Sequence, residues 1–195
     1  MRVLLIGENS VRTKILDQSL TKAGYHIVAK SGNTRRLLAQ INEEDADGVV
    51  IEVDAAGPVI TDQIRHVSQN HPCPIVIFSQ RGNADASRDA IKAGVSAFVV
   101  DGLKSERVSF IMEVAITRFH ETQALQKELQ KALADLQERK SIERAKGILM
   151  KKDRLSEETA YNTLRKMAMS HNKRLVDVAE SIITAEECLA LGLKQ

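Results

Sequence analysis

Residues 48–53 read GVVIEV, and this short stretch decides the fold. It is an apolar run interrupted only by Glu52. A nearly continuous apolar run of this length is typical of a strand that is covered on both faces, as the strands of parallel sheets are. We therefore predict a buried β-strand over Gly48–Val53 with helices on both sides of it.

Four similar runs lie before and after this strand, at Arg2–Ile6, His26–Ala29, Pro74–Phe78 and Ala97–Val100. Between the runs, apolar residues recur at helical spacing, and two of these helical stretches stop at a glycine. Strands that alternate with helices form parallel sheets with helices on both faces. The sequence therefore predicts an α/β fold: a doubly wound, five-stranded parallel sheet of the flavodoxin-like kind.

The composition narrows the class of protein further. No stretch approaches the roughly 20 apolar residues of a membrane span. Cys73 and Cys188 lie far apart and match no metal-ligand spacing, so we expect buried thiols in a reducing compartment and a cytoplasmic protein. Aromatic residues make up only 3% of the chain, which argues against single-strand binding on aromatic platforms. We find no nucleophile–base pattern, and we expect neither an enzyme nor a cofactor.

The working site of such a sheet lies beyond the carboxyl ends of its strands. The polar residues at these ends are Glu8, Asn9, Glu52, Asp54, Ser79 and Asp101. Hard divalent cations prefer oxygen ligands, so Glu52 and Asp54 could attract one, although we predict no dedicated metal site.

These residues and the segment AGVSAFVV resemble the receiver domain of two-component response regulators over about residues 1–118. A working receiver has an acidic pair after the first strand, a phosphoacceptor Asp ending the third, a Ser or Thr after the fourth and a Lys after the fifth. Here Glu8 keeps one acidic position and Asn9 takes the other, while Ser79 matches.

Two departures from the receiver pattern affect the phosphorylation chemistry. The acceptor position falls on Glu52, and Asp54 could serve only if the strand end shifted; the lysine position falls on Asp101. Without the lysine, and with the added negative charge of Asp101, a phosphorylated state would be poorly stabilised. Two interpretations stay open: a degenerate pocket that serves as a scaffold for protein contacts, and a phosphorylation switch.

From Ser105 onward the sequence predicts one long helix to about Lys152, since no Gly or Pro occurs between Gly102 and Gly147. Apolar residues at spacings of 4, 3 and 4 give two heptads of coiled-coil pattern: Leu125, Leu129, Ala132 and Leu136. We expect residues 119–138 to form a dimerising coiled-coil linker. The alternative is a monomer in which this segment folds back on the receiver-like domain.

The stretch Arg139–Arg174 is strongly basic, with eleven Lys or Arg against four Asp or Glu, while the whole chain carries a net charge of only +2. Such a concentration of cations suggests a polyanion partner. The alternative is a solvated helical surface.

Three helical stripes in residues 139–195 predict a small all-α domain. Ser156 is suited to cap the second helix and Asn172 the third. The basic residues fall mostly between the apolar stripes, so we expect them on the outside.

The segments ERAKGILM, SEETA, LRKMAM and DVAESII, within about residues 137–186, resemble the ANTAR domain, a three-helix RNA-binding module of transcription antiterminators. The complete arrangement is most similar to the NasT-type members, which control nitrate and nitrite assimilation operons. Three domains are therefore expected: a receiver-like domain at 1–118, the linker at 119–138 and the ANTAR domain at 139–195.

The resemblance implies a homodimer that binds two hairpins of a leader RNA and prevents formation of the terminator, under control of a nitrate- or nitrite-sensing partner protein. Lys146 and Arg165 would be the leading RNA contacts, with further contacts from Lys166, Lys173, Arg174 and Arg144. Ala145 and Gly147 would allow a close approach of RNA, although core packing is the simpler role for Ala145. The alternative is a DNA-binding or phosphorylation-controlled response regulator.

Overall fold

We describe a computed structural model of the chain, which covers residues 1–7, 9–32 and 36–192. The chain divides into two compact units, Met1–Ala124 and Leu125–Gln195, and the boundary lies inside one long helix. Among the described helices, none combines the length and the apolar character needed to cross a membrane.

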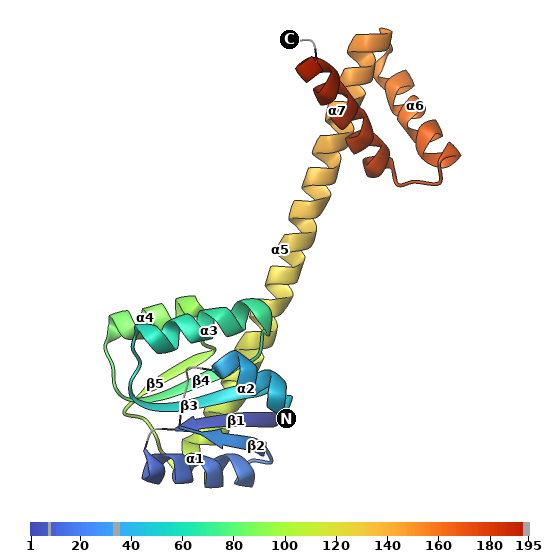
Figure 1. Ribbon diagram of the computed structural model, residues 1–195. Coiled ribbons are helices and arrows are strands. Elements are labelled where there is room, and N and C mark those ends of the chain that lie inside the picture. Colours follow the sequence, from blue (N-terminus) through green and yellow to red (C-terminus); the bar gives the residue numbers. More distant parts are fainter. Residues whose placement is uncertain (8, 33–35, 193–195) are drawn as a thin grey trace. The chain divides into compact units, whose positions relative to one another are not determined.

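The first unit contains a five-stranded parallel sheet with strand order β2-β1-β3-β4-β5 (Figure 1). Its strands are β1 (Arg2–Gly7), β2 (His26–Ser31), β3 (Gly48–Ala55), β4 (Ile75–Arg81) and β5 (Ala97–Val100). Its helices are α1 (Ser10–Lys22), α2 (Leu37–Glu44), α3 (Pro58–Asn70), α4 (Ala84–Ala93) and the start of α5 (Ser105–Asp153). The predicted doubly wound parallel sheet is confirmed, and β3 lies at its centre.

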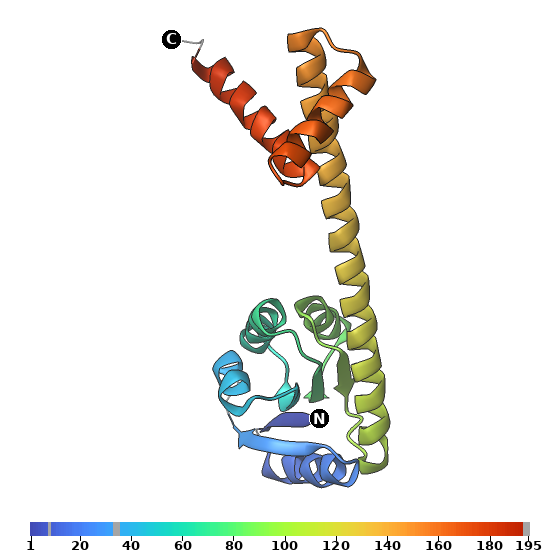
Figure 2. The ribbon, with the colours of Figure 1, turned by 90° about the vertical axis from the view of Figure 1, so that its right-hand side faces the viewer.

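Helices cover both faces of the sheet, as Figure 2 shows from the side. Helices α2, α3 and α4 pack on one face, against side chains such as Ile51 and Ile77, and α1 and α5 pack on the other, against Val50 and Phe78. All four of these side chains are buried, and each such burial stabilises the fold by roughly 1.5–3 kcal/mol. Residues on one strand alternate between the two faces, so Glu52 follows Val50 onto the side of α1.

Four strands extend further than the sequence predicted, and β1 and β2 end at Gly7 and Ser31. β3 continues to Ala55 and β4 to Arg81, and β4 begins at Ile75 rather than at Pro74. The pairing of Ala55 with Arg81 holds both ends in the sheet. Asp54 and Ser79 therefore belong to strands and not to the loops that follow them.

The second unit consists of the C-terminal part of α5, α6 (Glu157–Ser170) and α7 (Leu175–Gly192). A small aliphatic core joins the three helices around buried Ala145, Leu164 and Ala179. Confirming the sequence prediction, Ser156 caps α6: its Oγ accepts a hydrogen bond from Thr159 N at 3.2 Å.

Two local expectations about this unit were wrong. Asn172 does not cap α7, because it has a left-handed backbone with φ of 50° and the helix begins only at Leu175. Instead, Asp177 accepts a hydrogen bond from Arg174 N at 3.3 Å, which satisfies an amide at the start of the helix. Cys188 is exposed, whereas Cys73 is buried as expected.

Candidate nucleic-acid interface and receiver pocket

The receiver pocket is built around Glu52, whose side chain is fully buried near the carboxyl end of β3. Its Oε2 accepts a hydrogen bond from Asn9 N at 2.9 Å. Asn9 also caps α1, because its Oδ1 accepts hydrogen bonds from Val11 N and Arg12 N. Asn9 thus links the start of α1 to the acceptor position of the receiver pattern.

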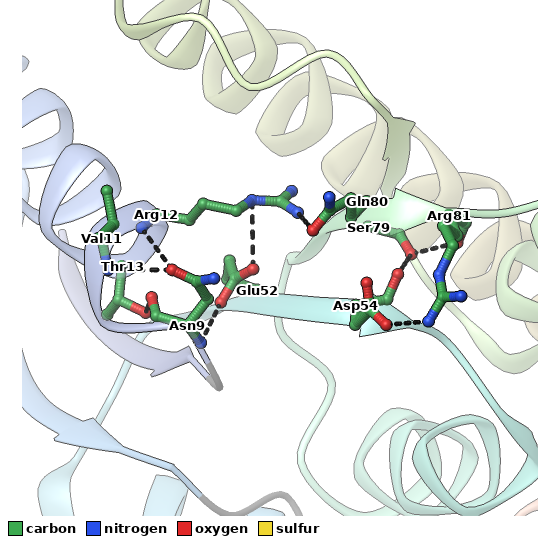
Figure 3. A network of polar contacts seen from close by, with 9 residues as sticks. All are labelled: Asn9, Val11, Arg12, Thr13, Glu52, Asp54, Ser79, Gln80 and Arg81. Atoms are coloured by element: carbon green, nitrogen blue, oxygen red, sulfur yellow. Dashed lines mark hydrogen bonds and ion pairs between the residues drawn. The ribbon is translucent and has the colours of Figure 1, made fainter.

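A buried carboxylate is costly unless a cation and hydrogen bonds compensate it, and Arg12 supplies the cation. Arg12 Nε lies 3.3 Å from Glu52 Oε1, and the arginine side chain is only 16% exposed. Its Nη1 donates to Gln80 Oε1 on β4 at 3.1 Å, so Arg12 connects α1, β3 and β4 (Figure 3). The sequence reasoning missed Arg12. The cap at Asn9 could have revealed it, because the cap brings the first turn of α1 next to this strand end.

Asp54 and Ser79 belong to a separate group of contacts, which Figure 3 shows apart from Glu52. Asp54 forms an exposed ion pair with Arg81. The Ser79 hydroxyl lies 2.6 Å from Arg81 O and 3.3 Å from Asp54 O, so its hydrogen-bond acceptors are backbone carbonyls. Glu52 and Asp54 therefore do not converge, and the described residues contain no group of three metal-ligating side chains.

Of the remaining predicted pocket residues, Asp101 is exposed and has a left-handed backbone with φ of 46°. Its backbone N–H donates a hydrogen bond to Ser79 O at 3.0 Å. Glu8 lies outside the described residues. Within the described part of the pocket, Arg12 already provides the positive charge that a divalent cation would provide to the buried carboxylate.

In the second unit, Lys146 is the predicted contact whose surroundings differ most from the expectation. It is buried, with only 8% of its surface exposed, so the expectation of an outward-facing lysine was wrong. Its ammonium donates to Glu143 Oε1 at 2.8 Å and to Glu157 Oε1 at 2.7 Å. These hydrogen bonds raise the pKa of Lys146, and the bond from Lys146 lowers the pKa of Glu157. A role for Lys146 in RNA binding stays a prediction.

Two other predicted contacts are exposed but already paired. Arg144 Nη2 donates to Glu187 Oε1 at 2.7 Å. Arg174 donates to Asp177 Oδ1 at 2.8 Å and to Glu138 Oε1 at 3.1 Å. The hydrogen bond with Asp177 is the main cause of the raised pKa of Arg174 and of the lowered pKa of Asp177. A phosphate at either arginine would compete with these carboxylates.

The remaining predicted contacts are exposed and form no ion pair within the described residues, although Lys173 helps to lower the pKa of Asp177. Seven basic residues of Arg139–Arg174 are exposed and form no ion pair with another described residue: Arg139, Lys140, Lys151, Arg154, Arg165, Lys166 and Lys173. They include three of the six predicted contacts. A phosphate can bind such unpaired surface cations without first breaking an existing ion pair.

The small residues beside Lys146 differ from each other. Ala145 is fully buried in the core of the three helices, which is the simpler of its two expected roles. At Gly147 an added Cβ would meet nothing within 4 Å in the described structure. The surface of α5 is therefore open at Gly147.

The fold and both sites define an ANTAR-type response regulator, and comparison with known proteins agrees. Residues 3–111 match the response regulator receiver domain and residues 129–183 match the ANTAR domain. The chain belongs to the response regulator receiver family and carries an ANTAR domain.

Three known proteins illustrate the similarity. The transcriptional regulatory protein PdtaR of Mycobacterium tuberculosis is 28% identical over 185 residues, which are 93% of this chain and 89% of PdtaR. The nitrate regulatory protein of Klebsiella oxytoca is 43% identical over 67 residues, 34% of this chain and 17% of that protein. The solved signal receiver domain of NarL from Mycobacterium tuberculosis has a TM-score of 0.52 at 14% identity, covering 58% of this chain and 94% of that domain. The two domains are regulatory ones, which indicates a regulator and not an enzyme.

Proposed function

We propose that this chain is a transcription antiterminator. In this proposal its ANTAR domain binds a two-hairpin leader RNA, and the bound form prevents the terminator hairpin. The observation that carries the proposal is the set of seven exposed basic residues without ion pairs in Arg139–Arg174, within a chain that matches the ANTAR family. Arg165, Lys166 and Lys173 are the proposed direct phosphate contacts.

Control of the receiver domain through a protein partner fits the pocket better than control through phosphorylation. The acceptor position holds a glutamate that is buried and paired with Arg12, and the lysine position holds Asp101. A phosphoryl group would add negative charge beside these carboxylates with no lysine to compensate it. The partner that we propose is a nitrate- or nitrite-sensing protein, and the support for this signal is the name of the Klebsiella oxytoca relative.

A homodimer through the linker helix is supported by a row of uncovered leucines. Leu125, Leu129, Leu133 and Leu136 are all exposed on α5. Three of them lie on the heptad pattern Leu125, Leu129, Ala132, Leu136, which a second copy of the helix would cover. A dimer would present two ANTAR domains to the two hairpins, and linking two binding events raises the overall affinity.

The test of the proposal is binding of the full chain to a leader RNA with two hairpins, compared with duplex DNA of the same length. We expect tight RNA binding that weakens steeply between about 50 and 200 mM salt, and a terminator that is read through in a transcription assay only when protein is present. Arg165→Ala is expected to weaken the binding and to reduce the salt slope by about one. Equal affinity for the DNA would contradict the proposal.

The alternative is a phosphorylation-controlled or DNA-binding response regulator. Incubation with a small-molecule phosphodonor and Mg²⁺ separates it from our proposal, because we expect no stable acyl phosphate on Glu52 or Asp54. The nitrate assignment has its own test: transporter and reductase genes for nitrate beside this gene, with a hairpin pair upstream of them, and readthrough that responds to nitrate.

A further inference from the structure

We propose that one face of α6, formed by Tyr161, Arg165 and Met169, binds an unpaired base of the RNA, and that Tyr161 stacks on this base. The inference rests on the proposed RNA-binding function and adds the residue that recognises a base. Phosphate contacts hold the backbone of an RNA but do not hold its unpaired bases, which proteins stack on flat side chains.

The three residues lie four positions apart on α6, so their side chains form one row along the helix. The adjacent row, formed by Ala160, Leu164 and Ala168, is buried. Tyr161 is 43% exposed and Met169 is 71% exposed. The row of Tyr161, Arg165 and Met169 is therefore a solvent-facing surface that carries two large side chains with apolar groups.

Tyr161 is unusual for this chain. It is the only Tyr, Phe or Trp after Phe119, and the sequence as a whole has just two tyrosines and four phenylalanines. The core of the three helices consists of small and aliphatic side chains, and Tyr161 is not one of them. The ring makes no hydrogen bond or aromatic contact with another residue among those that the structure describes.

The charge next to Tyr161 favours RNA as the partner. Arg165 and the adjacent Lys166 are exposed and form no ion pair with a described residue. A tyrosine ring and a guanidinium one helical turn apart are the two flat groups on which proteins stack unpaired RNA bases. The low aromatic content excludes a platform of several rings, but a single looped-out base needs only one ring.

The experiment uses the full chain and, as probe, a pair of RNA stem-loops selected from a library with randomised loops for binding to the wild-type protein. Tyr161→Ala is expected to weaken binding about 5- to 150-fold, the range for loss of one stacked base. Tyr161→Phe keeps the ring and should bind like the wild type. Asn162→Ala, a neighbouring exposed position on α6, is the matched control and should also bind like the wild type.

Three further tests separate stacking from other roles. Tyr161→Ala should leave the salt slope of binding unchanged, whereas Arg165→Ala should reduce it, because only the arginine neutralises a phosphate. An abasic nucleotide at the stacked loop position should weaken wild-type binding and have no effect on Tyr161→Ala. Tyr161→Leu keeps apolar bulk and an intact fold, and it should be as weak as Tyr161→Ala.

The possible outcomes bear differently on the two proposals. If the wild-type chain binds the RNA and Tyr161→Ala binds equally well, the base-stacking inference is wrong while the antiterminator proposal stands, and the face would then be assigned to a protein contact. If the wild-type chain enriches no RNA from the library, the proposed function itself fails. Additive effects of the abasic loop and Tyr161→Ala would also overturn the inference.

Discussion

Lys146 Nζ lies 2.7 Å from Glu157 Oε1, and this ion pair ties α5 to the first turn of α6. Glu143, one turn earlier on α5, takes a second hydrogen bond of the same ammonium at 2.8 Å. The lysine therefore joins two of the three helices of the ANTAR domain on the side where the sequence placed an RNA contact.

The first prediction concerns the role of this lysine. We expect Lys146→Met and Glu157→Gln each to lower the melting temperature by at most a few degrees, because the first removes both hydrogen bonds of the nearly buried ammonium and the second replaces one of its two charged acceptors by a neutral amide. If Lys146 only positions the helices, both variants should also weaken RNA binding without changing its salt slope. A direct phosphate contact gives a different pattern: Lys146→Met would lower the slope by about one, and Glu157→Gln, which removes one of the two carboxylates that compete for the ammonium, would keep or raise the affinity. Thermal unfolding together with binding at several salt concentrations distinguishes the two roles.

The second prediction is the pH dependence of the same contact. The pKa of Glu157 is lowered, chiefly by its hydrogen bond from Lys146. A carboxyl group whose pKa is lower in the folded than in the unfolded state stabilises the fold at pH values above its unfolded pKa. This stabilisation is lost as the pH falls through the folded pKa. The stability difference between the wild type and Glu157→Gln should therefore be constant near neutral pH and shrink below about pH 4. Denaturant unfolding of both proteins at a series of pH values measures this difference in stability. A difference that grows as the pH falls would contradict the prediction.

The third prediction uses the open surface at Gly147. Gly147→Ala should raise the free energy of unfolding by about 0.5–1 kcal/mol, because glycine is unfavourable inside a helix and the added methyl group meets no described atom within 4 Å. If RNA approaches α5 closely there, as we expect, the same variant should bind RNA more weakly. Opposite changes in stability and affinity would be hard to obtain from a folding defect. Unchanged RNA affinity would show that the RNA does not approach this residue.

The fourth prediction concerns the receiver pocket. Glu52→Ala leaves Arg12 without its carboxylate in a nearly buried position and should lower the free energy of unfolding by about 3 kcal/mol. Asp54→Ala is the matched control, because its ion pair with Arg81 is exposed and should contribute less than about 1 kcal/mol. Urea unfolding of both variants measures the two values, and similar small values would show that Glu52 is not a structural centre of the pocket.

The fifth prediction tests the linker. The double variant Leu129→Glu/Leu136→Glu places charges on the predicted seam of the coiled coil and should convert the dimer to a monomer. Ala134→Glu introduces the same charge on an exposed position of α5 that faces away from the seam, and it should leave the dimer intact. Sedimentation velocity measures the oligomeric state. A wild-type chain that sediments as a monomer would favour the alternative, in which residues 119–138 fold back on the receiver-like domain of the same chain.

The sequence predicted the sheet well because its signals are local. Strands such as Gly48–Val53 appear as continuous apolar runs, and Ser156 caps α6 within one turn of the residue that it contacts. The long helix was equally clear, since Ser105–Asp153 contains no proline and a single glycine, Gly147, through which the helix continues. The exact strand ends were less clear, because they depend on pairing with a neighbouring strand.

The side-chain contacts of the sites could not be predicted in the same way. The pattern of one helix placed Lys146 between apolar residues and hence outside, but the carboxylate that covers it comes from Glu157 on the next helix. Arg12 is 40 positions from Glu52 in the sequence, and no spacing rule connects the two. The domain boundaries at 118 and 138 and the RNA-contacting roles stay predictions.

Glu52 places a buried carboxyl group, paired with Arg12, where an active receiver has the aspartate that is transiently phosphorylated. Under the proposed control by a partner protein, the duration of a signal would be set by how fast the partner dissociates and not by how fast an acyl phosphate hydrolyses. For the same reason the regulator would not respond to the many histidine kinases and small phosphodonors that share one cell, because none of them could form a stable acyl phosphate on Glu52. The response would then follow the amount of partner and signal present at each moment, with no stored memory of earlier stimulation.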